Sequence, residues 1–233
     1  MNKARTRHYI FLAVAGMIAL IQSCAPVYRP NTIFTPMFER QGQLKGTGSF
    51  GSNGLNVHAG YSITDNLALT GGMIYASDVD SPGQTFFGEA GAGWYFPASI
   101  FRLEVLSGLG LGTATATGTY TVITERTIEA RGIYGRFYLQ PALGVSVSIV
   151  DLSIASRAVW VNFFRFEETR SNGQAASNVG GLFMEPALTL AVGPENFKAF
   201  GQFGFSIPSR RLEFDHLPFL FSAGVRLSLD RRD

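Results

Sequence analysis

The chain has 233 residues, of which 46% are hydrophobic and only 15% charged, with 27 glycines and 20 phenylalanines. Because an average soluble domain has about 25% charged residues, this composition argues against a disordered chain, a coiled coil and a water-facing helical bundle. Three of the 19 basic residues, Lys3, Arg5 and Arg7, lie at the N-terminus, and the other 16 nearly balance the 17 acidic residues. The charge therefore does not predict binding to nucleic acid.

The N-terminus has the pattern of a secretory signal peptide. Its basic residues precede an unbroken apolar run from Tyr9 to Ile21, which is too short for an ordinary membrane-spanning helix. We therefore predict that residues 1–23 form a signal peptide.

The end of the apolar run predicts a lipid anchor. Residues 21–24, Ile-Gln-Ser-Cys, resemble the lipobox of bacterial lipoproteins, in which the cysteine receives a diacylglycerol. Cys24 is the only cysteine in the chain, so an intramolecular disulfide is excluded. The alternative is ordinary signal cleavage after Ala25, which would leave an unlipidated chain that starts at Pro26.

The rest of the chain divides into a tether, a β-domain and a short tail. Residues 24–41 contain prolines and are predicted to form a periplasmic tether, residues 42–229 a barrel, and residues 230–233 a C-terminal tail. Within the barrel, apolar residues alternate with small or polar ones, which is typical of strands with two different faces. We predict strands near residues 42–50, 54–63, 66–76, 84–96, 100–117, 128–148, 150–165, 179–192, 197–207 and 217–229.

The lengths of the strands and their connections favour a membrane barrel. Most segments approach or exceed the roughly ten residues that a tilted strand needs to cross a bilayer. Short turns alternate with longer loops, as in outer-membrane barrels with periplasmic turns and outer loops. The predicted fold is therefore an all-β, antiparallel, up-and-down transmembrane barrel of about ten strands, with eight possible. Both chain ends are expected at the short-turn rim, with any lipid on Cys24 in the inner leaflet.

The two strand faces differ in a way that favours lipid outside. The polar face is mostly Gly, Ala, Ser and Thr, which suits a narrow lumen, whereas a soluble barrel would cover its outside with Lys and Glu. We predict a structural network of lumen charges at Glu89, Arg102, Glu104, Arg136, Arg157, Glu185, Lys198 and Arg226. We predict aromatic girdles at Tyr61, Tyr75, Phe86, Trp94, Phe96, Trp160, Phe164, Phe197 and Phe219. A soluble β-sandwich with a lipid tail remains the alternative fold.

Glycine-rich alternating strands also carry a family resemblance. Residues 71–75, Gly-Gly-Met-Ile-Tyr, and 91–96, Gly-Ala-Gly-Trp-Tyr-Phe, together with the lipobox and tight turns, resemble small outer-membrane barrels of the outer-membrane protein A/X-like superfamily, in the style of Bacteroidetes. The resemblance covers about residues 42–229. It implies a Gram-negative outer membrane and says nothing about a reaction.

The sequence holds no motif of a known catalytic or metal site. The three histidines, His8, His58 and His216, lie far apart in the predicted fold, so we expect no metal site and no cofactor. An Asp78–Val79–Asp80 run and the Asp215–His216 pair resemble faintly the groups of the omptin proteases, but solvated loop charges are the simpler explanation, because adjacent residues in an extended segment point to opposite faces and Asp215 could not orient His216. His58 could serve as an acid/base group, although a lumen hydrogen-bond network is the simpler interpretation.

These observations favour a non-enzymatic outer-membrane barrel lipoprotein with a structural, surface-contact or complex-subunit role. Its expected partners are outer-membrane lipids and other envelope proteins that contact the outer loops. The alternatives are an outer-membrane hydrolase that acts on lipid A, phospholipid or peptide through His58 or through Asp80 and His216, and a lipid-anchored periplasmic β-sandwich binding protein.

Overall fold

The computed structural model describes residues 26–77, 83–121, 125–169, 175–176 and 179–230. The predicted signal peptide, Cys24 and the predicted tail residues 231–233 lie outside this part of the chain. The barrel strands are β1 (Gln43–Gly51), β2 (Gly54–Ser62), β3 (Leu67–Ser77), β4 (Gln84–Ala98), β5 (Phe101–Thr121), β6 (Glu125–Val147), β7 (Val150–Glu168), β9 (Val179–Val192), β10 (Phe197–Phe205) and β12 (Phe219–Asp230).

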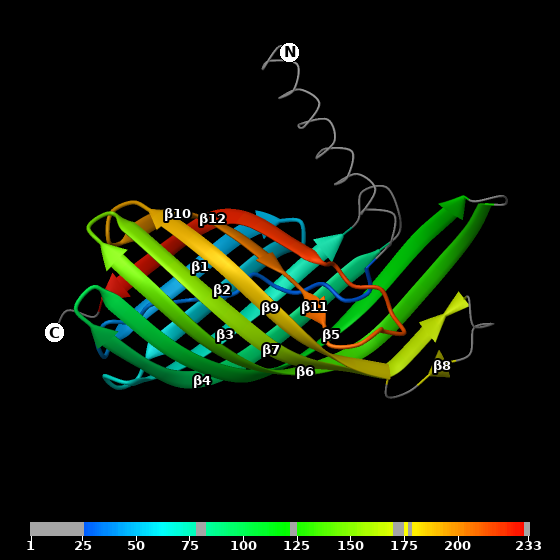
Figure 1. Cartoon of the computed structure of the whole chain (residues 1–233), viewed down its shortest axis with the longest axis horizontal. Coiled ribbons are helices and arrows are strands. Elements are labelled where there is room, and N and C mark those ends of the chain that lie inside the picture. The colour runs from blue at the N-terminus through cyan, green and yellow to red at the C-terminus, as the bar shows by residue number, and fades with distance from the viewer. Residues whose placement is uncertain (1–25, 78–82, 122–124, 170–174, 177–178, 231–233) are drawn as a thin grey trace, which may run out of the picture.

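These ten antiparallel strands form a closed barrel (Figure 1). Each pairs with the next along the chain, and β12 pairs with β1 from Gln43↔Asp230 to Gly51↔Ser222 to close the cylinder. Two short strands lie at the long-loop rim, where β8 (Ala175–Ala176) pairs antiparallel with β7 and β11 (Ile207–Pro208) pairs antiparallel with β9. Closure confirms the predicted barrel and excludes the eight-stranded and β-sandwich alternatives.

Burial alternates along the strands as the sequence predicts. In β9, for example, buried and exposed residues alternate from Val179 to Val192, because successive side chains point to opposite faces of the wall. Large apolar side chains are exposed on the outward face of all ten barrel strands, and all nine predicted girdle aromatics are among them. A continuous apolar exterior of this size requires lipid, which makes the barrel transmembrane. No helix in the described part of the chain is long and apolar enough to cross a membrane.

The β5–β6 hairpin is longer than a membrane crossing requires. The outward apolar residues of β5 end at Leu111 and those of β6 begin at Ile133, and beyond them Thr113, Thr115 and Arg131 are exposed instead. Because the apolar part of each strand already spans the roughly ten residues needed, the remainder projects past the membrane. Figure 1 shows this hairpin extending beyond the rest of the long-loop rim.

The N-terminal segment lies inside the barrel. Residues 27–38, which we name the plug, are buried without exception, although the sequence analysis assigns them to a periplasmic tether. That assignment is corrected by the contacts described below, which join the plug to the inner faces of the strands. Gly42, with a φ of 82°, then turns the chain into β1.

The plug runs from the long-loop rim to the short-turn rim. At its start, the Val27 and Tyr28 amides donate to the Asp215 oxygen (3.0 and 3.2 Å), in the loop between β11 and β12. Just after its end, the Gln41 amide donates to Asp65 Oδ1 (3.1 Å), in the short turn between β2 and β3. The expectation that both chain ends emerge at the short-turn rim is therefore wrong for the described N-terminal residues.

Candidate functional site

The lumen is the best-defined polar site of the described chain, and its upper layer, which lies nearer the long-loop rim, joins charges from four strands to the plug. Arg157 of β7 and Glu185 of β9 are directly opposite across the strand pair, and Arg157 Nη2 lies 2.7 Å from Glu185 Oε2. The other oxygen of Glu185 accepts a hydrogen bond from the Tyr28 hydroxyl (2.8 Å). Arg157 Nη2 also donates to the Asn31 main-chain oxygen (3.1 Å). Both ends of this buried ion pair are thereby tied to the plug.

A second buried ion pair shares the same plug residue. Arg136 of β6 pairs with Glu89 of β4 and also donates to the Asn31 side-chain oxygen. The Asn31 amide nitrogen lies 2.6 Å from Glu89 Oε1 and 3.0 Å from His58 Nε2. The guanidinium of Arg136 lies 4.1 Å from the centre of the Phe87 ring, a cation–π contact. Asn31 is fully buried and connects both ion pairs with His58.

The lower layer, near the short turns, has its own charges. Asp151 of β7 binds Lys198 (2.6 Å) and Arg226 (3.2 Å), which are neighbours on β10 and β12. Arg102 pairs instead with Glu39, just after the plug (2.7 Å).

The last predicted lumen charge, Glu104, has no ion-pair partner among the described residues. One of its oxygens accepts the Phe38 amide (3.1 Å), and the other is buried without a hydrogen bond. All eight predicted lumen charges thus lie inside the barrel, and seven of them form ion pairs. The sequence analysis missed the partners Asp151 and Glu39, because Asp151 lies at the very start of β7, next to the β6–β7 turn, and Glu39 lies in the supposed tether.

The plug backbone is held by side chains of the wall. The Gln202 amide group forms two bonds with Ile33, accepting its N–H (2.8 Å) and donating to its oxygen (2.8 Å). Gln140 donates to the Phe34 oxygen (2.8 Å), and Asn56 accepts the Thr32 amide (2.9 Å). An extended segment in a lumen has no strand partner for its peptide groups, so these side chains supply the hydrogen bonds that burial makes obligatory. The wall is therefore built to bind this particular segment.

Apolar plug residues fill the two ends of the lumen. Tyr28 packs on Phe183 and Tyr134 within the main aromatic cluster of the upper half (ring centres 4.7 and 6.1 Å apart). At the lower end, Phe38 packs on Tyr95, with ring centres 5.4 Å apart. Aromatic contact at both ends and polar contact between them fix the position of the plug along the barrel axis.

His58 belongs to this network. Its ring stacks on Phe34 at 5.6 Å and 8°. Beside it is a cavity of about 10 Å³ that Thr70 also lines, and both His58 Nδ1 and Thr70 Oγ1 are buried without a described partner. A polar cavity of this size can hold one water molecule. The contact with Asn31 places His58 in the lumen hydrogen-bond network.

The groups of the omptin-like hypothesis are described only in part. Asp78 and Asp80 lie outside the described residues. His216 Nε2 lies 3.2 Å from the Ser206 oxygen, and its ring packs on Phe183 (5.3 Å). Burial lowers the pKa of His216, and the hydrogen bond to Ser206 opposes this shift. The described contacts of His216 thus tie its ring to the Ser206 main chain and to an aromatic side chain. No group of three or more His, Cys, Asp or Glu residues in the described chain could hold a metal ion.

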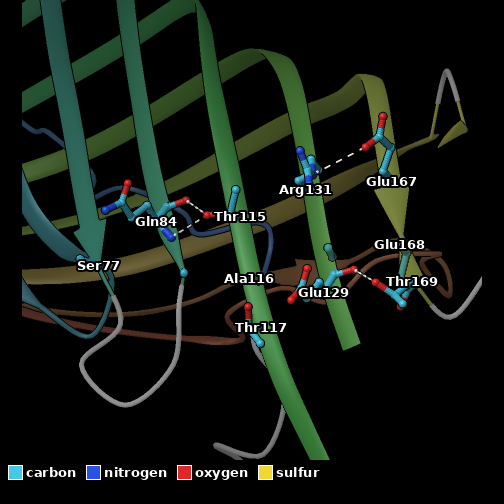
Figure 2. A pocket seen from close by; sticks show the side chains of 12 residues that line it. Ser77, Gln84, Thr115, Ala116, Thr117, Glu129, Arg131, Glu167, Glu168 and Thr169 are labelled. Atoms are coloured by element: carbon cyan, nitrogen blue, oxygen red, sulfur yellow. Dashed lines mark hydrogen bonds and ion pairs between the residues drawn. The ribbon is translucent and has the colours of Figure 1, made fainter. Parts of the chain in front are cut away.

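An open hollow of about 570 Å³ lies at the long-loop rim between β3 and β7 (Figure 2). Three glutamates line it, Glu129, Glu167 and Glu168, and Arg131 lies 3.6 Å from Glu167. Thr169 donates to the Glu129 main-chain oxygen (3.2 Å). Sequence reasoning missed this hollow, because it forms only where the projecting ends of separate strands meet.

No protein-family model matches the sequence, and no curated protein matches it. Among solved structures, the chain is similar to the N-terminal β-barrel domain of Pseudomonas aeruginosa OprF, with 13% identity, 82% of this chain and 99% of that chain covered, and a TM-score of 0.36. LpxR from Salmonella typhimurium is 9% identical, with 79% and 99% covered and a TM-score of 0.35. The β domain of the Bordetella autotransporter BrkA is 12% identical, with 82% and 100% covered and a TM-score of 0.33. These are likenesses of fold.

Proposed function

We propose that this protein is an outer-membrane β-barrel lipoprotein whose lumen is closed by its own plug, and that it has a structural or surface-contact role without catalysis. The observation that carries the proposal is the complete burial of residues 27–38 among lumen side chains. A channel needs a continuous hydrated path, and here the plug takes the place of water along the barrel axis.

Conductance in planar bilayers tests this proposal. The full-length protein is expected to give no steady openings, because charges that could guide ions, such as Glu89 and Arg136, are bonded to each other and to Asn31. Large and stable openings of the intact chain would contradict the closed lumen and indicate a porin.

The proposed contact role is assigned to the surface of the long-loop rim. The projecting β5–β6 hairpin and the rim hollow with Glu129, Arg131 and Glu167 offer a polar surface beyond the apolar band. Envelope proteins and polar groups of surface lipids are the proposed partners. Chemical cross-linking from a residue of the hollow, with Glu129→Cys as the anchor, identifies what contacts it in cells. The same reagent on Glu195→Cys, in the opposite turn, is the matched control.

The absence of catalysis and the lipid on Cys24 are separate parts of the proposal. The double variant His58→Ala, His216→Ala is expected to match the parent in lipase, lipid A deacylase and protease assays. Loss of a measured activity would favour the hydrolase alternative.

For the lipid, Cys24→Ala is expected to remove the mass of the acyl chains from the intact protein, whereas an unchanged mature mass would mean ordinary signal cleavage.

A further inference from the structure

The plug crosses the barrel once, and this single pass fixes on which side the described chain begins. Residues 27–38 number twelve, and at about 3.3 Å per residue they reach roughly 40 Å at most. The hydrocarbon core of a bilayer is about 30 Å thick. The plug is therefore long enough to cross once and too short to cross and return. Val27 and Gln43 must lie at opposite rims, as their contacts with Asp215 and Ser62 show.

The direction of the plug is set by the different contacts that its two ends make at the two rims. At the long-loop rim the Leu217 amide donates to the Tyr28 oxygen (3.0 Å), which completes a short parallel bridge between Tyr28 and His216. At the short-turn rim the Lys45 ammonium donates to the Met37 oxygen (2.7 Å), and Arg40 pairs with Asp230. Each end has partners from its own rim, so the reversed threading would lose both sets.

The two rims correspond to the two sides of the membrane. In outer-membrane barrels the short turns face the periplasm and the long loops face outward. In this chain the turns β2–β3, β4–β5, β6–β7 and β9–β10 lie at the rim where β1 begins and β12 ends. The β11–β12 loop, which holds the start of the plug, lies at the other rim.

We propose that the N-terminal end of the mature protein is displayed on the outer surface of the cell, threaded outward through the lumen of its own barrel. This inference rests on the proposed function, which supplies the outer membrane and its orientation. It replaces the expected periplasmic N-terminus. Cys24 precedes Val27 by three residues, which span roughly 10 Å at most. A lipid on Cys24 would therefore reach the outer leaflet and not the inner one.

Epitope accessibility on intact cells tests the proposal. A short epitope is inserted between Ala25 and Pro26 of the full-length protein, and antibody binding is compared before and after permeabilisation. Matched insertions after Arg210, in the loop between β11 and β12, and after Glu195, in the β9–β10 turn, report the two rims. We expect the epitopes at Ala25 and Arg210 to bind antibody on intact cells, and the epitope at Glu195 to bind only after permeabilisation.

Two results would overturn the proposal. Binding at Ala25 only after permeabilisation, with Arg210 accessible, would mean that the plug enters from the periplasm. Accessibility of Glu195 without Arg210 would mean that the barrel has the opposite orientation.

Because an inserted epitope could disturb assembly, a single substitution provides a second test. In Pro26→Cys, the new thiol is expected to react with a membrane-impermeant maleimide on intact cells, and failure to react while Arg210→Cys does so counts against the proposal. The heat-dependent gel mobility of every variant reports the closed barrel separately. Loss of that shift in the unmodified protein would refute the proposed function itself, whatever the epitopes show.

Discussion

The outer and inner faces of the barrel wall follow different rules. On the outer face, residues such as Leu109 and Leu188 contact lipid, and any apolar side chain of suitable size satisfies the environment. On the inner face, residues such as Arg157 and Gln202 each have defined partners on the plug or on a facing strand. The outer face is therefore adapted to lipid in general, whereas the inner face is adapted to one particular segment of this chain. Substitutions on the two faces should differ accordingly.

Removing the plug should give the largest effect. Deletion of residues 27–38 takes away the apolar and hydrogen-bonded filling of the lumen and leaves Arg136, Arg157 and Glu185 facing water. We expect single-channel openings in planar bilayers where the parent gives none, and a lower unfolding temperature in detergent. A deleted barrel that shows the heat-dependent gel shift but conducts no ions would contradict the plug as the element that closes the lumen.

Breaking the upper buried ion pair should come next. In Arg157→Leu, the buried Glu185 loses its ion-pair partner and keeps the hydrogen bonds from Tyr28 and Ser206, so we expect a loss of about 3–5 kcal/mol in the free energy of unfolding. Urea unfolding of the refolded barrel in detergent measures this loss. Arg165→Leu is the matched control, because Arg165 is largely exposed and its pair with Glu167 should contribute less than about 1 kcal/mol. Equal losses for both variants would show that the buried lumen ion pair contributes no more to stability than the exposed one.

A charge on the outer face should cost somewhat less than a broken lumen pair. Leu109 is 66% exposed within the apolar band, and Leu109→Lys places an ammonium in lipid. We expect a loss of about 2–4 kcal/mol in a bilayer, whereas Leu109→Ile should be close to neutral. Folding measurements in vesicles provide the comparison. If Leu109→Lys were neutral in lipid, the outer face would not be in contact with the membrane core.

The smallest contrast concerns two glycines on opposite faces. A Cβ at Gly72, on the inner face, would come within 2.2 Å of the His58 ring, whereas a Cβ at Gly201, on the outer face, meets nothing within 4 Å. Gly72→Ala should therefore lower the free energy of unfolding by about 1–3 kcal/mol through overpacking. Gly201→Ala should change it by less than about 0.5 kcal/mol. Thermal unfolding of the two variants in the same detergent checks the order.

The strands of the barrel wall are predicted well because their pattern depends only on residues close together in the sequence. The period-two pattern follows from the pleat, so the predicted segments 179–192 and 54–63 nearly match β9 and β2. The inner position of Arg157 follows from the same rule. Its partner Glu185 lies on the next barrel strand and was predicted on the same face, although the pairing itself depends on register.

The plug could not be predicted in the same way, because it has no periodicity of its own and makes only long-range contacts. Two signals in the sequence point to it in retrospect. One is the frequency of large apolar residues between Val27 and Phe38, which is unusual for a tether in water. The other is the set of inner-face glycines such as Gly60 and Gly144, where a Cβ would meet Phe34, Phe38 or Met37. The glycines that narrow-barrel packing was expected to explain also leave room for the plug.

The position of the plug can be tested most directly by a disulfide between it and the wall. Thr35 Oγ1 and Ser153 Oγ lie 3.0 Å apart, so cysteines at both positions can reach disulfide distance without moving the backbone far. In Thr35→Cys, Ser153→Cys, mild oxidation of native membranes should join the two peptides, as detected by mass spectrometry, while Thr35→Cys alone should give no such product. A folded double variant whose two thiols stay free and react with maleimide would contradict a plug inside the lumen.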